Sequence, residues 1–222
     1  MTRRFVLELD RLKDLLSEMS RSVQRQIDDV SEALFSSDRD RAQQVVDSDG
    51  KIDQFEIIID RTCEGIIALS QPVASDLRLL VSGLKMSTDL ERMGDQAANI
   101  AREIIAADAF DTSLLKRLQL DVMTDRVRAM VSDAFASFIH GDAPRAKSIC
   151  DRDDAVDEIN LSVIRTLSEE NGLGLEYPQR VHLLIITQNI ERIGDLATNI
   201  AEEVIFLVRA RTIKHHYQEF TG

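Results

Sequence analysis

One stretch of this chain occurs twice, and the two copies lie one hundred residues apart. The first copy is DLERMGDQAANIARE at residues 89–103, and the second is NIERIGDLATNIAEE at residues 189–203. Both copies keep Glu-Arg-x-Gly-Asp, and both repeat the same small and amide residues after it. Similarity at such long range is the signature of a duplicated structural unit. The chain is therefore expected to fold as two copies of one unit.

The composition favours helices over strands. Among 222 residues there are only nine Gly and three Pro, and aromatic residues make up 5%. A chain poor in turn and strand formers and rich in Ala, Leu, Glu, Arg and Ile is predicted to be all-α. Breaker residues divide it into six helical stretches, at about residues 4–36, 38–69, 72–107, 113–140, 143–170 and 177–212. Pro72 is expected in the first turn of the third stretch.

The two halves also correspond outside the repeated stretch. SDRDRA at 37–42 is similar to GDAPRA at 141–146, and Asp49-x-x-x-Asp53 is similar to Asp153-x-x-x-Asp157, both at an offset of 104. The change of offset, from 104 to 100, is about one helical turn, which a duplicated unit can absorb. We therefore predict two tandem three-helix bundles related by a pseudo-twofold axis. The first repeat covers residues 1–109 and the second covers residues 110–222.

Helical periodicity separates an apolar stripe from an acidic face in each copy. The predicted core stripes are Met86, Leu90, Met93, Ala97, Ile100 and Ile104 in the first copy, and Ile186, Ile190, Ile193, Ala197, Ile200 and Val204 in the second. The opposite face carries Glu91, Asp95 and Asn99 in the first copy and Glu191, Asp195 and Asn199 in the second. These acids are expected to point outward or into a groove, because the core does not require them.

Four pairs of acids stand one helical turn apart, and each such pair destabilises a helix by about 0.2–0.5 kcal/mol unless something compensates. A bound cation would compensate, since hard and borderline metals take oxygen ligands and carboxylate pairs on facing helices hold metals in di-iron bundles. Acids that are merely solvated remain an alternative on spacing alone. No Glu-x-x-His occurs, and none of His140, His182, His215 and His216 falls beside a motif, so an all-oxygen site is expected.

Gly94 and Gly194 stand in the middle of predicted helices, where Gly costs on the order of 1 kcal/mol relative to Ala. Close helix packing is the expected reason, and space for a metal cluster or a partner is the alternative. Cys63 and Cys150 are interpreted as ordinary buried or half-buried residues without chemistry.

Charge and hydropathy limit the classes of partner. The net charge of -12 disfavours nucleic acid, which requires clustered Lys and Arg, and favours cationic partners including metal ions. There is no basic start followed by an apolar segment, and no apolar run of the roughly 20 residues that cross a bilayer. A cytoplasmic location is therefore expected.

QPVASDLR, ERMGDQAANIARE and ERIGDLATNIAEEVIF, together with the two Asp-x-x-x-Asp motifs, resemble the PhoU family of phosphate-transport regulators. The resemblance covers nearly the whole chain. It implies a cytoplasmic protein, often a homodimer, that reaches the inner membrane only through its partners. These partners are the phosphate ABC transporter and its phosphate-sensing histidine kinase, and the implied role is to restrain phosphate uptake and the phosphate-starvation response when phosphate is plentiful.

The resemblance also implies multinuclear metal binding, with iron, zinc or manganese as candidate ions. The motif positions designate Asp49, Asp53, Glu91, Asp95, Asp153, Asp157, Glu191 and Asp195 as ligands, with Asn99, Glu103, Asn199 and Glu203 as additional candidates. The ending LVRARTIKHHYQEFTG departs from the small, Gly-containing ending of the family. A di-metal carboxylate enzyme and a metal-free structural adaptor are the competing hypotheses, although the sequence shows no separate catalytic base.

Overall fold

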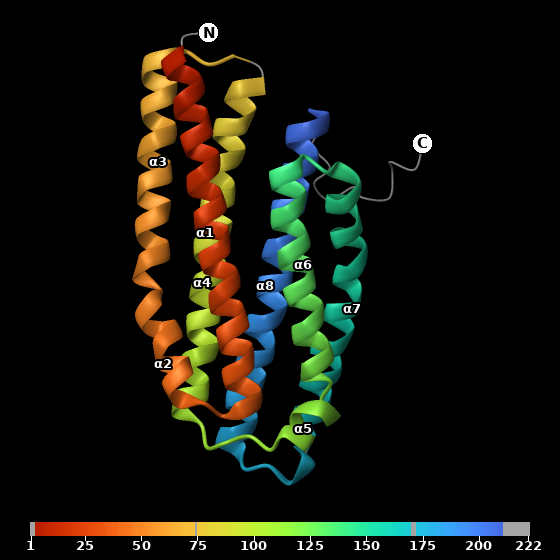
Figure 1. Ribbon diagram of the computed structural model, residues 1–222. Coiled ribbons are helices and arrows are strands. Elements are labelled where there is room, and N and C mark those ends of the chain that lie inside the picture. Colours follow the sequence, from red (N-terminus) through yellow and green to blue (C-terminus); the bar gives the residue numbers. More distant parts are fainter. Residues whose placement is uncertain (1–2, 74, 170–171, 211–222) are drawn as a thin grey trace.

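Two helical bundles lie side by side in this protein (Figure 1). The structure is a computed structural model that describes residues 3–73, 75–169 and 172–210. Its elements are α1 (Arg3–Ser36), α2 (Arg39–Ser48), α3 (Gly50–Ser70), α4 (Ser75–Ala106), α5 (Thr112–Arg117), α6 (Leu120–His140), α7 (Ala143–Ser168), η1 (Gly172–Gly174) and α8 (Tyr177–Arg209). The described residues contain no strand, so the predicted all-α class is confirmed.

The first bundle consists of α1 to α4 and the second of α5 to α8, which confirms the predicted pair of three-helix units. In each bundle one of the three positions is filled by two consecutive helices, α2 with α3 in the first and α5 with α6 in the second. The long helices α4 and α8, which carry the repeated stretch, pack against each other and join the bundles. Among the described residues, no helix has the length and apolar character needed to cross a membrane.

Three predicted helix boundaries were wrong. The second stretch divides at Asp49, whose N–H bonds the Val46 carbonyl at 3.4 Å in a tighter turn, because Ser48, Asp49 and Gly50 are weak helix formers. The fourth stretch divides at Gln119, which adopts the left-handed conformation at φ 58°. Pro72 precedes its helix rather than entering it, since α4 begins at Ser75.

Helix caps repeat between the bundles and explain where the second helix of each unit starts. The Asp38 carboxylate accepts a hydrogen bond from the Arg41 N–H at 2.9 Å, and the Asp142 carboxylate accepts one from the Arg145 N–H at 3.0 Å. Each Asp thereby satisfies a backbone N–H that the first helical turn leaves without a partner. The two caps stand at the offset of 104 that the sequence comparison found.

The predicted core stripes of α4 and α8 are confirmed, because all of their members are at most 5% exposed. The two helices pack against the first long helix of their own bundle, α1 or α6, and against each other. Burial of such a stripe is what makes a long helix stable, since propensity alone contributes little. The acidic face is thereby directed away from the core and toward α3 in the first bundle and α7 in the second.

The contact between α4 and α8 is polar at both ends. Glu203 of α8 accepts hydrogen bonds from Ser82 at 3.0 Å and from Lys85 at 2.7 Å, both on α4. Glu103 of α4 lies 2.5 Å from Nδ1 of His182 on α8. Ser82 of α4 pairs with Glu203 of α8, and Glu103 of α4 pairs with His182 of α8, so the two helices are antiparallel. The pseudo-twofold axis exchanges the two contacts.

Candidate metal centre

The first acidic cluster lies where the junction of α2 and α3 meets the middle of α4. Asp49 belongs to the junction, Asp53 to the first turn of α3, and Glu91 and Asp95 to α4. Burial raises the pKa of Glu91 to about 7, and the nearby carboxylates of Asp95 and Glu56 add to the effect. The pKa of Asp49 is also raised, first by burial and then by Asp95. The four predicted acids therefore share one electrostatic environment.

The second acidic cluster repeats this arrangement between α7 and α8. Oxygen atoms of Asp157, Glu191 and Asp195 all lie within 4.8 Å of one another, a spacing at which one cation can contact all three. Burial raises the pKa of Glu191 to about 7 and that of Asp153 to about 6, with Asp195 as the next cause in both cases. One oxygen of Asp157 is buried without a hydrogen-bond partner among the described residues.

Each pair of motifs meets within its own repeat. Asp49 is affected by Asp95 of the same bundle, and Asp153 by Asp195 of the same bundle. The sequence left this pairing open, because spacing does not reveal which helices face each other. A metal held here would link the second helix of a bundle to the third.

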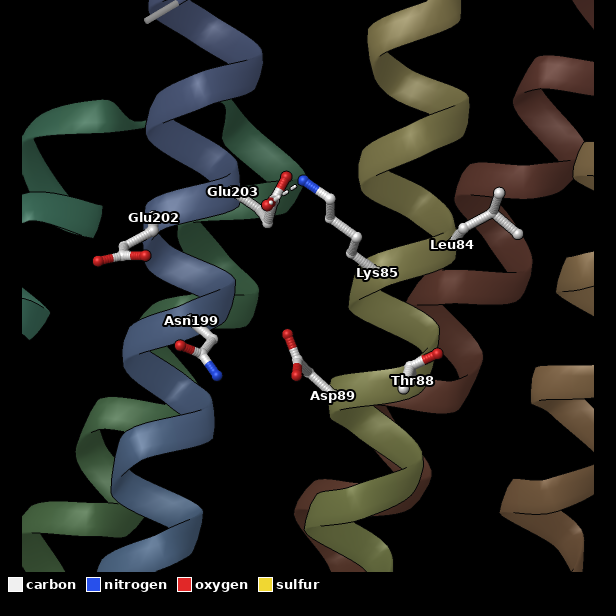
Figure 2. A pocket seen from close by; sticks show the side chains of 7 residues that line it. All are labelled: Leu84, Lys85, Thr88, Asp89, Asn199, Glu202 and Glu203. Carbon is white, nitrogen blue, oxygen red and sulfur yellow. Dashed lines mark hydrogen bonds and ion pairs between the residues drawn. The ribbon is translucent and has the colours of Figure 1, made fainter. Parts of the chain in front are cut away.

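The four additional candidates occupy other positions. Asn99 accepts a hydrogen bond from Arg102 at 2.7 Å, whereas Asn199 is exposed and lines an open groove of about 450 Å³ between α4 and α8. Figure 2 shows Glu203 at the same groove with its carboxylate directed toward Lys85. Glu103 contacts His182. His182 does not stand beside a motif in the sequence, so this neighbour of a candidate ligand follows from the fold alone, while His215, His216 and most of the divergent ending lie outside the described residues.

Sequence reasoning missed several neighbours of the first cluster. Glu56 acts on Glu91 and accepts a hydrogen bond from Thr88 at 3.0 Å. Arg102 lies 3.7 Å from an Asp49 oxygen. Gln26 of α1 is 5% exposed, and its amide oxygen has no hydrogen-bond partner among the described residues. The sequence gives one signal for Gln26: it is a polar residue that stands between Val23 and Ile27 on the apolar stripe of α1.

The chemistry of the second cluster, in which oxygen atoms of Asp157, Glu191 and Asp195 converge, is that of a hard or borderline cation site. Carboxylates crowded into a half-buried space repel one another and hold protons at pH values where solvated carboxylates are ionised. A cation of charge two or more removes that repulsion and uses the oxygen atom of Asp157 that lacks a partner. The donor set therefore fits a metal ion.

The two glycines of the repeated stretch pack closely, as expected, but not equally. A Cβ at Gly94 would lie 2.9 Å from Cδ1 of Ile52 and 3.2 Å from the amide oxygen of Gln26. A Cβ at Gly194 would meet its nearest neighbour, Val127, at 3.6 Å, an ordinary contact. Gly194 is therefore the glycine that has room for a methyl group.

Replacing these glycines by alanine should give different results. Gly194→Ala is expected to stabilise the metal-free protein by up to about 1 kcal/mol, because Ala is the better helix former, which raises the Tm by about 2–4 °C. Gly94→Ala should gain less or lose stability, since Ile52 and Gln26 must move. Thermal unfolding followed by circular dichroism measures both, and equal gains at the two positions would contradict the packing difference.

The fold and the site define a class of protein: a duplicated all-helical scaffold with one acidic cluster in each repeat. The sequence model described as the PhoU domain matches residues 16–104 and again 120–204. The chain belongs to the PhoU family.

Relatives and solved structures agree with this assignment. A phosphate-specific transport system accessory protein PhoU homolog of Aquifex aeolicus is 37% identical, with 97% of each chain covered. The PhoU homolog of Pseudomonas putida is 36% identical to this chain, and the match covers 96% of this chain and 84% of the homolog. The crystal structure of the phosphate transport system regulatory protein PhoU from Streptococcus pneumoniae matches with a TM-score of 0.85 at 27% identity, covering 94% of this chain and 98% of that one. PhoU from Pseudomonas aeruginosa matches with a TM-score of 0.82 at 33% identity, covering 93% and 100%.

Proposed function

We propose that this protein regulates phosphate uptake and the phosphate-starvation response. It acts in the cytoplasm, docks on the phosphate ABC transporter and on its partner histidine kinase, and restrains both when phosphate is plentiful. The support is family membership over nearly the whole chain, with relatives named as accessory proteins of phosphate-specific transport. It reaches the inner membrane through these partners, and it acts as a homodimer.

The second part of the proposal is that both acidic clusters bind iron, zinc or manganese. The observation that carries it is the set of four acids at matching places in two repeats, in which burial and neighbouring carboxylates raise the pKa values of Glu91 and Glu191 to about 7. The metal stiffens each bundle by linking its second and third helices, and so fixes the helix faces that partners contact. We propose binding rather than catalysis, since the similar proteins are named for accessory and regulatory roles.

Metal analysis tests the site directly. Protein without an affinity tag, prepared without chelator and then reconstituted with iron, zinc or manganese, should retain metal after desalting. The double variant Asp95→Ala with Asp195→Ala should retain none while its helical content is unchanged, because each substitution removes a central carboxylate of one cluster. The exposed Asp108 and the half-buried Asp121 serve as control positions for a matched double variant that keeps its metal. If the reconstituted wild type retains no metal above the background level, the proposal is contradicted.

Partner docking needs a separate experiment. A pull-down with the wild-type chain from phosphate-replete cells should recover the transporter and the kinase. The metal-free double variant should bind the kinase more weakly, by about tenfold or more in Kd, if the metal fixes the docking surface. Recovery of neither partner would contradict the regulatory role, and unchanged kinase affinity without metal would show that the metal does not control docking.

A further inference from the structure

Gln26 on α1 is a buried polar side chain whose hydrogen bonding is incomplete. It is 5% exposed, and its amide oxygen has no hydrogen-bond partner among the described residues. Burying an amide oxygen without a partner costs free energy, so native proteins rarely keep one without a reason. The Gln26 oxygen therefore indicates that a positive or donating group completes its contacts.

Ser48, at the end of α2, fixes the orientation of the Gln26 amide. The Gln26 amide nitrogen donates to Ser48 Oγ at 2.8 Å, while the Ser48 hydroxyl donates to the Val45 carbonyl at 2.9 Å. Because the Ser48 proton is committed to Val45, Ser48 can only accept from the Gln26 side chain. The amide nitrogen must therefore face Ser48, and the amide oxygen must point elsewhere.

The Gln26 oxygen lies against the turn of α4 that carries the first acidic cluster. It lies 3.2 Å from the place that a Cβ on Gly94 would take, and Oδ1 of Asp49 lies 3.5 Å from the same place. Gly94 stands three residues after Glu91 and directly before Asp95, so it lies beside these acids on the surface of α4. The absence of a side chain at Gly94 lets the Gln26 oxygen approach the helix this closely.

The two carboxylate oxygens of Asp49 have different neighbours. Oδ2 lies 3.7 Å from the Arg102 guanidinium, whereas Oδ1 is the oxygen on the Gly94 side, where the Gln26 oxygen lies. Gln26 Oε1 and Asp49 Oδ1 are both acceptors when the carboxylate is ionised. A cation between the two oxygen atoms, or a proton on Asp49, would remove their repulsion. The other carboxylates of the cluster favour the cation, because they can bind it as well.

The second repeat has an apolar residue in the place of Gln26. VSEA in α1 and VSDA in α6 stand at an offset of 101, which pairs Gln26 with Val127. Cγ2 of Val127 lies 3.6 Å from the place that a Cβ on Gly194 would take, and Oδ1 of Asp153 lies 3.7 Å from it. The glycine and the aspartate oxygen are therefore repeated, but the amide oxygen is not. Duplication alone does not account for Gln26.

We propose that Gln26 is a metal ligand of the first cluster, and that its amide oxygen joins α1 to the ion held by the motif acids. This inference rests on the proposed metal binding and adds a ligand that the motifs do not contain. Among the described residues, three carboxylate oxygens converge in the second cluster alone, so a further oxygen is what the first cluster needs. An amide carbonyl is a neutral oxygen ligand of the kind that suits Mn²⁺.

Mn²⁺ binding to a protein with one working cluster tests the ligand. The one-cluster variant, Asp157→Asn with Asp195→Asn, lacks two of the three converging carboxylates of the second cluster, so the Mn²⁺ that it binds belongs to the first. Free Mn²⁺ is followed by electron paramagnetic resonance. Adding Gln26→Met, which keeps the length of the side chain but lacks the oxygen, should raise the Kd about tenfold or more, the size of effect that supporting residues have at metal sites. Gln24→Met, at a half-buried position on α1, should leave the Kd unchanged.

Gln26→Glu separates metal binding by Gln26 from its support of Ser48. Glu keeps an oxygen for the metal and loses the NH₂ group that donates to Ser48. If the oxygen is a ligand, Gln26→Glu in the one-cluster variant should lower the Kd, and by more than Gln24→Glu, which adds the same charge on α1. If Gln26 acts only by holding Ser48, Gln26→Glu should weaken Mn²⁺ binding as Gln26→Met does, and the inference is overturned.

The outcomes distinguish this inference from the proposed function. If the wild type binds no Mn²⁺, the proposed metal binding fails. If the wild type binds Mn²⁺ and the one-cluster variant does not, the first cluster holds no ion and Gln26 is not a ligand. If the one-cluster variant has the same Kd with Gln26→Met as without it, metal binding stands and the Gln26 oxygen is not a ligand.

Discussion

Metal-free protein should lose stability as the pH rises from 5 to 8. Glu91, Asp153 and Glu191 have pKa values raised to about 7, 6 and 7, because burial and neighbouring carboxylates disfavour their charged forms. A carboxyl whose folded pKa exceeds its unfolded pKa binds its proton more tightly in the folded state. Its stabilising contribution is complete below the unfolded pKa, near 4, and is lost as the pH rises through the folded pKa.

The loss should be large enough to measure. Four like-charge pairs at i and i+4 amount to roughly 1–2 kcal/mol when all are ionised, which is about 2–8 °C in Tm for a chain of this size. Thermal unfolding at pH 5, 6, 7 and 8 in the presence of a chelator measures it. Saturating Mn²⁺ should reverse the trend, because metal binding needs deprotonated ligands and stabilises the folded state by mass action.

Variants that cannot ionise provide the control. Glu91→Gln with Glu191→Gln should be more stable than the wild type at pH 8 without metal, and its Tm should depend less on pH. The exposed Glu158 and Glu64 lie outside the eight motif acids. Replacing both by Gln should leave the slope of Tm against pH as it is in the wild type. If the slope of Tm against pH is the same in the Glu91/Glu191 variant and in the Glu64/Glu158 variant, the clusters do not cause the pH dependence.

The fold could be predicted from the sequence because duplication and periodicity are properties of the sequence itself. The stripes of α4 and α8 are buried as their spacing indicated, and the acids stand off the core. The division at Gln119 could not be foreseen, because neither Gly nor Pro marks it and a left-handed residue there depends on tertiary packing. Similarly, Asp49 has helical dihedral angles, and only its hydrogen bond to the residue three positions earlier, Val46, shows that α2 ends there.

The candidate site could be predicted in part. Spacing identified the eight motif acids, since the i, i+4 relation is local. The partners across helices were not identified, because they are distant in sequence: Gln26 lies 22 residues from Ser48, and His182 lies 79 residues from Glu103. Glu203 illustrates the limit, since its hydrogen-bond partners Ser82 and Lys85 lie 121 and 118 residues away in the sequence.

Replacing Lys85 should destabilise the contact between the two repeats. The side chain of Glu203 is 6% exposed, whereas that of Lys85 is 45% exposed, so the pair lies at the edge of the interface (Figure 2). Removing one partner of a buried pair leaves an uncompensated charge, at a cost of 3–5 kcal/mol when the pair is fully buried. Because Lys85 is partly solvated, we expect about 2 kcal/mol for this pair.

Lys85→Met should therefore lower the Tm by about 4–8 °C, measured by thermal unfolding at pH 8. Met keeps an apolar chain beside the Phe206 ring, over which the Lys85 ammonium lies at 5.8 Å, so the loss of packing is small. Adding Glu203→Gln should recover most of the loss, because a Gln oxygen still accepts the Ser82 hydrogen bond without a buried charge. Lys116→Met, at an exposed position on α5, is the matched control. If Lys85→Met and Lys116→Met have equal Tm values, the buried carboxylate does not depend on Lys85.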